Sequence, residues 1–128
     1  VKVEVEINFT EDIDKVRVAV KKMLGELQLE VVEEDKSKRL VGRAEGQEAL
    51  SRFQELLRKE RIRNAARRGF YDGLRGNTII FYLNKQVGYV GHISFSQSVG
   101  ESPLGPIHVE IQCENPQNLI DWLAPRIT

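Results

Sequence analysis

Apolar and polar side chains alternate strictly in two stretches of the sequence, Val1–Phe9 and Ile107–Cys113. Successive side chains of a strand point to opposite faces of a sheet, so each stretch predicts a strand with one buried face and one wet face. This alternation is the feature that most constrains the fold. It requires a sheet with a single apolar face, and other elements of the chain must cover that face.

Residues with helical spacing follow the first strand. We predict a helix from about Glu11 to Leu27 with Thr10 as its cap, because its apolar residues recur every three or four positions: Ile13, Val16, Val20, Met23, Leu24 and Leu27. The stretches Leu29–Val32 and Arg39–Ala44 then predict a pair of strands joined through the polar residues 33–38.

A second helical stripe begins after Gly46 and changes phase near residues 59–61. Its first part contains Ala49, Leu50, Phe53, Leu56 and Leu57, whereas a rotated stripe contains Ile62, Ala65, Ala66 and Phe70. The change predicts two helices or a sharp bend near Lys59–Arg61, with Gly73 and Gly76 ending the second helix. At about 100° per residue, Arg61 and Arg68 fall on one flank of the second stripe, and Arg63 and Arg67 on the other.

The remaining residues favour strands and a last helix. Strands are predicted at Thr78–Leu83, at Val87–Phe95 and at the stretch ending in Cys113, with a loop over residues 96–106. Asn115 and Pro116 predict a helix start, because Asn caps helices and Pro loses no hydrogen bond at the first position. The order β-α-β-β-α-α-β-β-β-α over one domain, residues 1–128, predicts the α+β class: a two-layer sandwich with helices on one face of a largely antiparallel mixed sheet.

Composition limits the class of protein. A chain of 128 residues with 41% hydrophobic residues can bury an ordinary core without metals or disulfides. Cys113 is the only cysteine, so one chain can form neither an internal disulfide nor a cysteine zinc cage. No run approaches the roughly 18 apolar residues of a membrane span, and residues 1–9 do not resemble a signal-peptide core. We therefore expect a soluble, intracellular protein of the cytoplasm that makes no membrane contact.

The chain has no net charge, but its positive charges are concentrated in one segment. Residues 51–75 contain eight cations and three anions, a net +5, against −3 for residues 1–50 and −2 for residues 76–128. Six of these cations occupy the run from 58 to 68: Arg58, Lys59, Arg61, Arg63, Arg67 and Arg68. Polyanions respond to local potential rather than to net charge, so the run favours RNA or another anionic partner.

Several stretches, in this order, resemble an uncharacterised archaeal family of predicted RNA-binding or exosome-associated proteins: Phe9–Asp12, Arg52–Arg68, Leu83–Val87, Leu104–Ile107 and Ile120–Pro125. The resemblance covers essentially the whole chain. It implies an RNA partner and a fold similar to that of the ribosomal large-subunit protein that binds the small accessory ribosomal RNA. It supplies no catalytic residue.

The candidate RNA site starts from the cationic run. Guanidinium groups bind phosphate oxygens in pairs and stay charged at any working pH, and such a helix suits backbone shape and 2′-hydroxyls better than base sequence. Tyr71 is added as a base-stacking residue. Lys85 is added as an isolated cation that could hold a phosphate or a substrate carboxylate, with Asn84 and Gln86 supplying amide groups.

Each of these patterns has a second interpretation. The cationic run also fits a solvated helix that pairs with an acidic cluster, made of Glu30, Glu33, Glu34 and Asp35. The triplet Asn84–Gln86 also fits a hairpin turn.

The sequence offers little for catalysis. His92 and His108 lie on predicted strands without metal-ligand spacing, and Cys113 has no nucleophile signature. No P-loop, dinucleotide fingerprint, nucleophile elbow or zinc motif is present, so we expect no metal, no cofactor and no catalytic residue. The leading hypothesis is a non-catalytic RNA-binding or ribonucleoprotein accessory protein. The alternatives are a protein-interaction module, with an acidic partner or as a homodimer, and a small enzyme acting on an anionic substrate.

Overall fold

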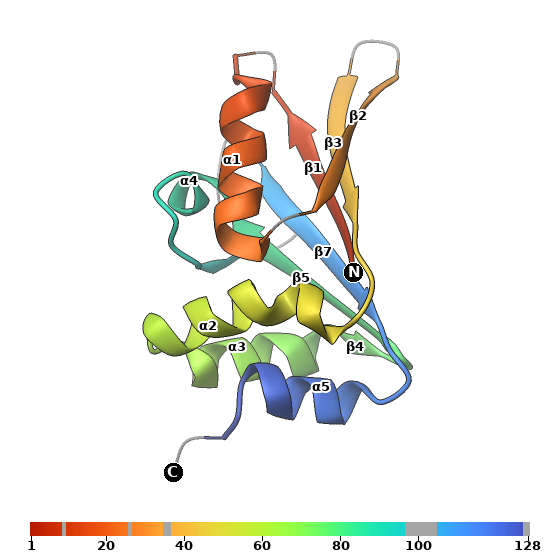
Figure 1. Cartoon of the computed structure of the whole chain (residues 1–128), viewed down its shortest axis with the longest axis vertical. Coiled ribbons are helices and arrows are strands. Elements are labelled where there is room, and N and C mark those ends of the chain that lie inside the picture. Colours follow the sequence, from red (N-terminus) through yellow and green to blue (C-terminus); the bar gives the residue numbers. More distant parts are fainter. Residues whose placement is uncertain (9, 26, 35–36, 97–104, 127–128) are drawn as a thin grey trace.

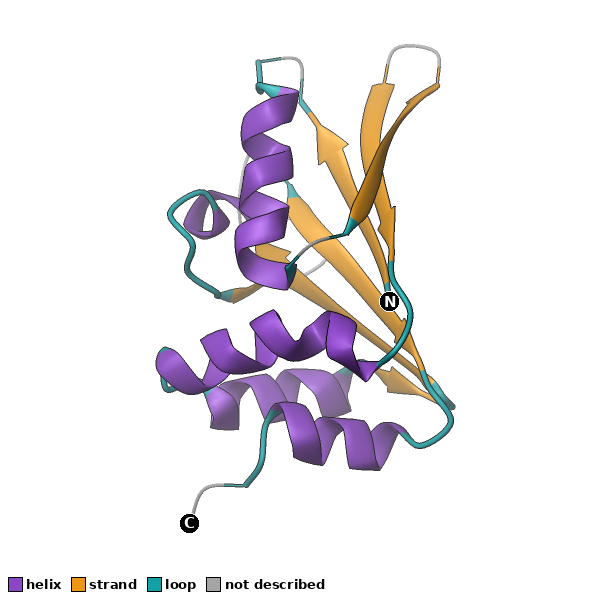
Figure 2. Cartoon of the chain, viewed as in Figure 1, coloured by secondary structure: helices purple, strands orange, loops and turns teal. Residues whose placement is uncertain are grey.

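One layer of the fold is an antiparallel sheet, and the helices lie against one of its faces (Figures 1 and 2). The computed structural model describes residues 1–8, 10–25, 27–34, 37–96 and 105–126. In these residues the strands are β1 (Lys2–Ile7), β2 (Gln28–Glu34), β3 (Ser37–Arg43), β4 (Leu74–Arg75), β5 (Thr78–Asn84), β6 (Phe95–Ser96) and β7 (Pro106–Gln112). The helices are α1 (Ile13–Leu24), α2 (Ser51–Lys59), α3 (Arg63–Asp72), α4 (Lys85–Gly88) and α5 (Pro116–Leu123), and a 3₁₀ turn, η1 (Gln47–Leu50), precedes α2.

The sheet has the strand order β2-β3-β1-β7-β5-β4, with β6 paired to the same edge of the sheet through β5. Every pairing is antiparallel. The predicted α+β class with helices on one face of the sheet is therefore confirmed. Within the described helices, none is both long enough and apolar enough to cross a membrane.

The alternation of side chains decides which face of the sheet the helices cover. In β5 the residues Ile79, Phe81 and Leu83 are buried while their neighbours are partly exposed. Phe81 stacks on Phe53 of α2 with ring centroids 5.6 Å apart, and meets the ring of Phe70 of α3 edge-on at 5.0 Å. These aromatic contacts fix the two helices that carry the cationic run onto β5, near one edge of the sheet.

The predicted break between the two helices is confirmed at residues 60–62. The amide of Arg61 donates to the carbonyl of Arg58, and the amide of Ile62 donates to that of Leu57. This pair of bonds is the Schellman pattern, which places one residue in the left-handed region and usually uses glycine there. Here that residue is Arg61, with φ 59°, so an arginine occupies a strained turn between the helices.

Two predictions about secondary structure were wrong. Residues 87–95 do not form a strand, because the side chain of Asn84 accepts the amide of Val87 and starts α4. Of the described residues 87–96, only Phe95 and Ser96 pair with β5. The cap of α1 is Asp12 rather than Thr10, since the carboxylate of Asp12 accepts the amide of Asp14. Most of the predicted loop over 96–106 lies outside the described residues.

Candidate nucleic-acid interface

The cations of the run gather on the end of α2, the turn after it and α3. Arg58, Lys59, Arg61 and Arg68 are exposed and Arg63 is half-buried; we call these five residues the arginine surface. Arg68 lines a hollow beside β5 and β6, whereas Arg63 lines a different hollow beside α5. The two flanks predicted from helical spacing are therefore occupied as expected.

The acidic hairpin lies at the other end of the molecule from this surface. Figure 1 shows the tips of β2 and β3 at the top and the layer of α2, α3 and α5 at the bottom. Glu33 pairs with Lys38 at 3.5 Å, and Glu34 pairs with Arg39 at 2.9 Å, both inside the hairpin. Asp35 lies outside the described residues. Among the residues that are described, no carboxylate forms an ion pair with any member of the arginine surface.

Glu60, the single anion of the run, is occupied elsewhere. Its carboxylate accepts the amide of Ile93 at 3.0 Å and contacts Nδ1 of His92 at 3.0 Å. The carboxylate thus ties the turn between the helices to the segment before β6. It does not form an ion pair with the arginines on either side of it.

Arg67 belongs to the run in sequence but not to the arginine surface. Its Nη1 atom lies 2.7 Å from Oδ1 of Asp121 and donates to the carbonyl of Ala124 at 3.1 Å. Its guanidinium also covers the ring of Tyr71, 5.3 Å from the centroid. Arg67 therefore joins α3 to α5, and Tyr71, which is 39% exposed, keeps only part of its surface for stacking.

Lys85 is not at the surface, and the prediction that it contacts phosphate beside the arginine helix is corrected by its burial. The side chain is 0% exposed. Its Nζ atom donates to the carbonyl of Glu6 at 2.6 Å and to Oε1 of Glu11 at 3.0 Å. Lys85 is thus a buried ion-pair partner, brought against a carboxylate that lies 74 residues earlier in the chain.

Glu11 is the centre of this buried network. Its second oxygen accepts the hydroxyl of Tyr89 at 2.6 Å, and its first accepts the backbone and side-chain amides of Asn8. Burial raises the pKa of Glu11, but the hydrogen bonds from Tyr89, Asn8 and Lys85 outweigh it and hold that pKa below its ordinary value. Burial, and then the hydrogen bond to Glu11, raise the pKa of Tyr89. Two stretches that carry the family resemblance, 9–12 and 83–87, therefore meet at a structural contact.

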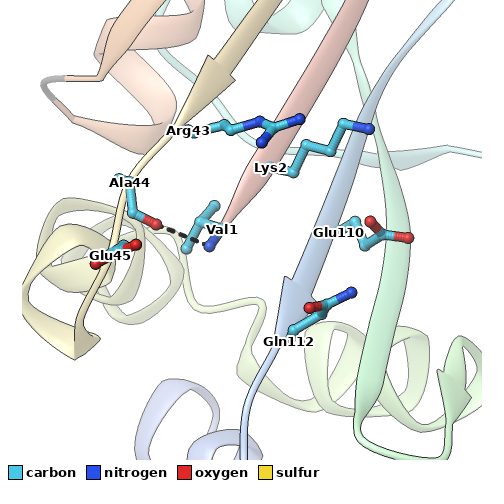
Figure 3. Close-up of a pocket in the computed structure, with 7 residues that line it drawn as sticks. All are labelled: Val1, Lys2, Arg43, Ala44, Glu45, Glu110 and Gln112. Carbon is cyan, nitrogen blue, oxygen red and sulfur yellow. Dashed lines mark hydrogen bonds between the residues drawn. The ribbon is translucent and has the colours of Figure 1, made fainter.

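The face of the sheet opposite the helices carries mixed charge. Figure 3 shows a hollow at the end of this face, where Lys2 and Arg43 lie near Glu110, and Glu45 lies beside the backbone of residue 44. Two cations and two anions line this hollow, so it has no net attraction for a polyanion. His108 also faces this side, with its ring 5.2 Å from the ring of Tyr82.

The remaining candidates for catalysis are dispersed. His92 is exposed and contacts Glu60 in the turn between α2 and α3, whereas His108 lies on the open face of the sheet beside Tyr82. Burial raises the pKa of the Cys113 thiol, which disfavours a reactive thiolate. In the described part of the chain, no three histidine, cysteine or acidic side chains cluster as a metal site would require.

Comparison with known proteins gives a family match over most of the chain. A family model described as RNA binding matches residues 1–113. A UPF0201 protein of Pyrococcus horikoshii is 41% identical over 126 residues, which are 98% of this chain and 89% of that protein. A UPF0201 protein of Sulfurisphaera tokodaii is 44% identical over 127 residues, 97% of this chain and 86% of that protein. The crystal structure of the UPF0201 protein from Methanococcus jannaschii matches with a TM-score of 0.88 at 29% identity, covering 99% of this chain and 93% of that one.

Proposed function

The chain belongs to the UPF0201 family of archaeal proteins, whose family model is described as RNA binding, and we propose that it grips the RNA phosphate backbone with the arginine surface. In this proposal the protein is non-catalytic and acts as an accessory component of a ribonucleoprotein. The observation that carries the proposal is the arginine surface itself: four exposed cations and one half-buried cation without a described acidic partner, at the end of the molecule away from the acidic hairpin.

The chemistry of the surface suits phosphate better than a protein carboxylate or a small substrate. Four of its five members are arginines, whose planar forks bind two phosphate oxygens at once. They are spread over two helices and the turn between them, which matches a repeating backbone rather than a single anion. The expected readout is backbone shape and 2′-hydroxyls, with weak sequence preference and strong salt dependence.

The strain at Arg61 supports the same proposal. A non-glycine residue in the left-handed region loses roughly 1–2 kcal/mol relative to an ordinary conformation. The backbone of the turn calls for glycine, yet the position carries an exposed cation between Arg58 and Arg63. Strained positions of this kind are common at binding sites, where the side chain has a role that offsets the strain.

A test removes three exposed cations of the arginine surface. In Lys59→Gln/Arg61→Gln/Arg68→Gln we expect RNA binding to weaken strongly while the fold is kept. A matched control, Lys15→Gln/Lys38→Gln/Arg43→Gln, removes three exposed cations from α1 and β3. Both variants lower the net charge by the same amount, so only the position of the lost charge differs.

The slope of the logarithm of the RNA association constant against the logarithm of the salt concentration measures the number of phosphate contacts. Each lost contact reduces the magnitude of this negative slope by about 0.7 for a single strand or about 0.9 for a duplex, so three lost contacts reduce it by about 2 to 3. Labelled single-stranded and duplex RNA are titrated across a salt series by fluorescence anisotropy. Equal slopes for the two variants would refute the proposal.

A second candidate function is contact with a second copy of the chain. Val18 of α1 is 50% exposed and Val90, just after α4, is 69% exposed. Val18 lines a hollow together with Tyr89, the neighbour of Val90 in the chain, and a contiguous exposed apolar patch favours a protein contact. A concentration-dependent increase in mass by light scattering, abolished in Val18→Lys/Val90→Lys, would support it.

A further inference from the structure

A groove of about 300 Å³ lies between α2, α3 and α5. We call it the α2–α5 groove. The residues that define its chemistry are Ser51, Gln54, Glu55, Arg58, Arg63 and Trp122. Two arginines and a tryptophan therefore line the same small space, together with one acidic and two neutral polar residues.

Cross-links between side chains and backbone fix the walls of the groove. Nε2 of Gln54 donates to the carbonyl of Trp122 at 2.9 Å and ties α2 to α5. Arg67 ties α3 to α5 through Asp121 and the carbonyl of Ala124. A site whose walls are held in this way binds a ligand with little loss of side-chain freedom.

Arg63 provides the observation that points to a ligand. Its Nε atom is buried and has no hydrogen-bond partner among the described residues. Buried donors almost always have an acceptor, because an unmatched one loses its hydration without replacement. Arg63 is also the first residue of α3, whose N-cap, Ile62, offers no side-chain bond, so the positive end of the helix dipole adds to the guanidinium charge.

We propose that the α2–α5 groove binds one nucleotide of the RNA, with its phosphate on Arg58 and Arg63 and its base against Trp122. This inference rests on the proposed function. It adds a pocket for one nucleotide to a surface that otherwise contacts only the RNA phosphate backbone. Two arginines match the oxygens of one phosphate, and an indole face accepts any base by stacking. Glu55 accepts a sugar hydroxyl, and Ser51 completes the polar rim. The volume lies at the small end of ligand pockets, as a single nucleotide requires.

Trp122 is the only tryptophan of the chain, so its fluorescence reports on the groove directly. Uridine 5′-monophosphate is titrated with excitation at the red edge of the indole band, where the uracil base hardly absorbs. We expect a saturable change in the wild-type protein. Uridine, which lacks the phosphate, and ribose 5-phosphate, which lacks the base, should each bind about tenfold more weakly or worse.

Substitutions of groove residues test whether the nucleotide that changes the Trp122 fluorescence binds in the groove. We expect Arg63→Gln and Arg58→Gln each to weaken binding of the nucleotide by about tenfold or more. Lys15→Gln, at an exposed position of α1, should leave it unchanged. Arg58 is exposed, so Arg58→Gln keeps the test valid even if Arg63→Gln does not fold. A 5′-phosphorylated oligouridine and its 5′-hydroxyl counterpart then separate a terminal phosphate from an internal one as the natural occupant.

The outcomes separate this inference from the proposed function. An unchanged Trp122 signal, together with RNA binding that still depends on Lys59, Arg61 and Arg68, would overturn the groove and leave the arginine surface intact. A nucleotide titration that persists in Arg58→Gln and Arg63→Gln would also overturn it. Nucleotide binding lost only in the groove variants, with RNA binding weakened both in them and in the Lys59, Arg61 and Arg68 variant, would support both.

Discussion

Replacing Lys85 tests whether the buried network at Glu11 is a structural contact. In Lys85→Met the long apolar stem is kept, while the ammonium and its bonds to Glu11 and to the carbonyl of Glu6 are lost. The side chain of Glu11 is only 4% exposed, so the carboxylate is left buried without its cation. We therefore expect the folded state of Lys85→Met to be less stable than that of the wild type. At low temperature, where the variant stays folded, it should bind RNA as the wild type does.

The magnitude follows from what Glu11 keeps. Breaking one side of a buried ion pair lowers the free energy of unfolding by about 3–5 kcal/mol. Glu11 retains the hydroxyl of Tyr89 and the amides of Asn8, which still stabilise the carboxylate. We therefore expect a loss near the lower limit, about 3 kcal/mol.

Urea denaturation followed by circular dichroism measures this loss, and Lys15→Met is the matched control. Lys15 is exposed on α1, so its replacement should change the free energy of unfolding by less than about 0.5 kcal/mol. The double variant Lys85→Met/Glu11→Leu should lose less than the two single variants together, because no uncompensated charge remains. A loss below about 1 kcal/mol in Lys85→Met, less than a buried pair loses when broken, would refute the reasoning.

Three further predictions concern stability. The pKa of Glu11 is lowered in the folded state, so this residue stabilises the fold above pH 4.5, its ordinary pKa, and the stabilisation is lost as the pH falls through the lower folded pKa. The pKa of Tyr89 is raised from 10.0 in the folded state, so the fold also loses stability as the pH rises above 10.0. Thermal melts from pH 3 to 11 should show this plateau, and Tyr89→Phe should flatten its alkaline side. Arg61→Gly should raise the free energy of unfolding by up to about 1 kcal/mol, because left-handed strain of about 1–2 kcal/mol exceeds the extra entropy of glycine, about 0.5–1 kcal/mol; a less stable variant in urea denaturation would contradict the turn geometry. Gly73→Ala should destabilise the fold by about 2 kcal/mol or more, because its methyl group would overlap the carbonyl oxygen of Ile80. Gly76 is exposed and has a positive φ, so Gly76→Ala tests only the strain of a side chain at that φ.

Much of the fold was predictable because its signals are local. The alternation of β1 and β7 and the phase change between α2 and α3 depend on neighbouring residues alone, and both are confirmed. The apolar pattern of residues 87–95, from which a strand was wrongly predicted, also fits a short helix followed by a turn. What decides between them is the capping bond from Asn84 to Val87, and an asparagine before a polar pair also fits a hairpin.

The composition of the site was less predictable because its partners are distant in sequence. Nothing near Lys85 indicates that it meets Glu11, and nothing in the run indicates that Arg67 alone is held by Asp121. Helical spacing did place Arg63 and Arg67 on one flank of α3. It could not tell that α5 packs there, so the α2–α5 groove with Trp122 had no signal in the sequence.

The most direct test of the central claim is to map the RNA contact on the protein. Amide and arginine side-chain resonances of the ¹⁵N-labelled chain are followed by NMR while a short RNA is added at low salt. The proposal predicts that the shifts concentrate on residues 58–72, with Arg61 and Arg68 among the most affected, and that β2 and β3 stay unchanged. Shifts concentrated on the open face of the sheet, around Tyr82 and His108, with α3 unaffected, would contradict it.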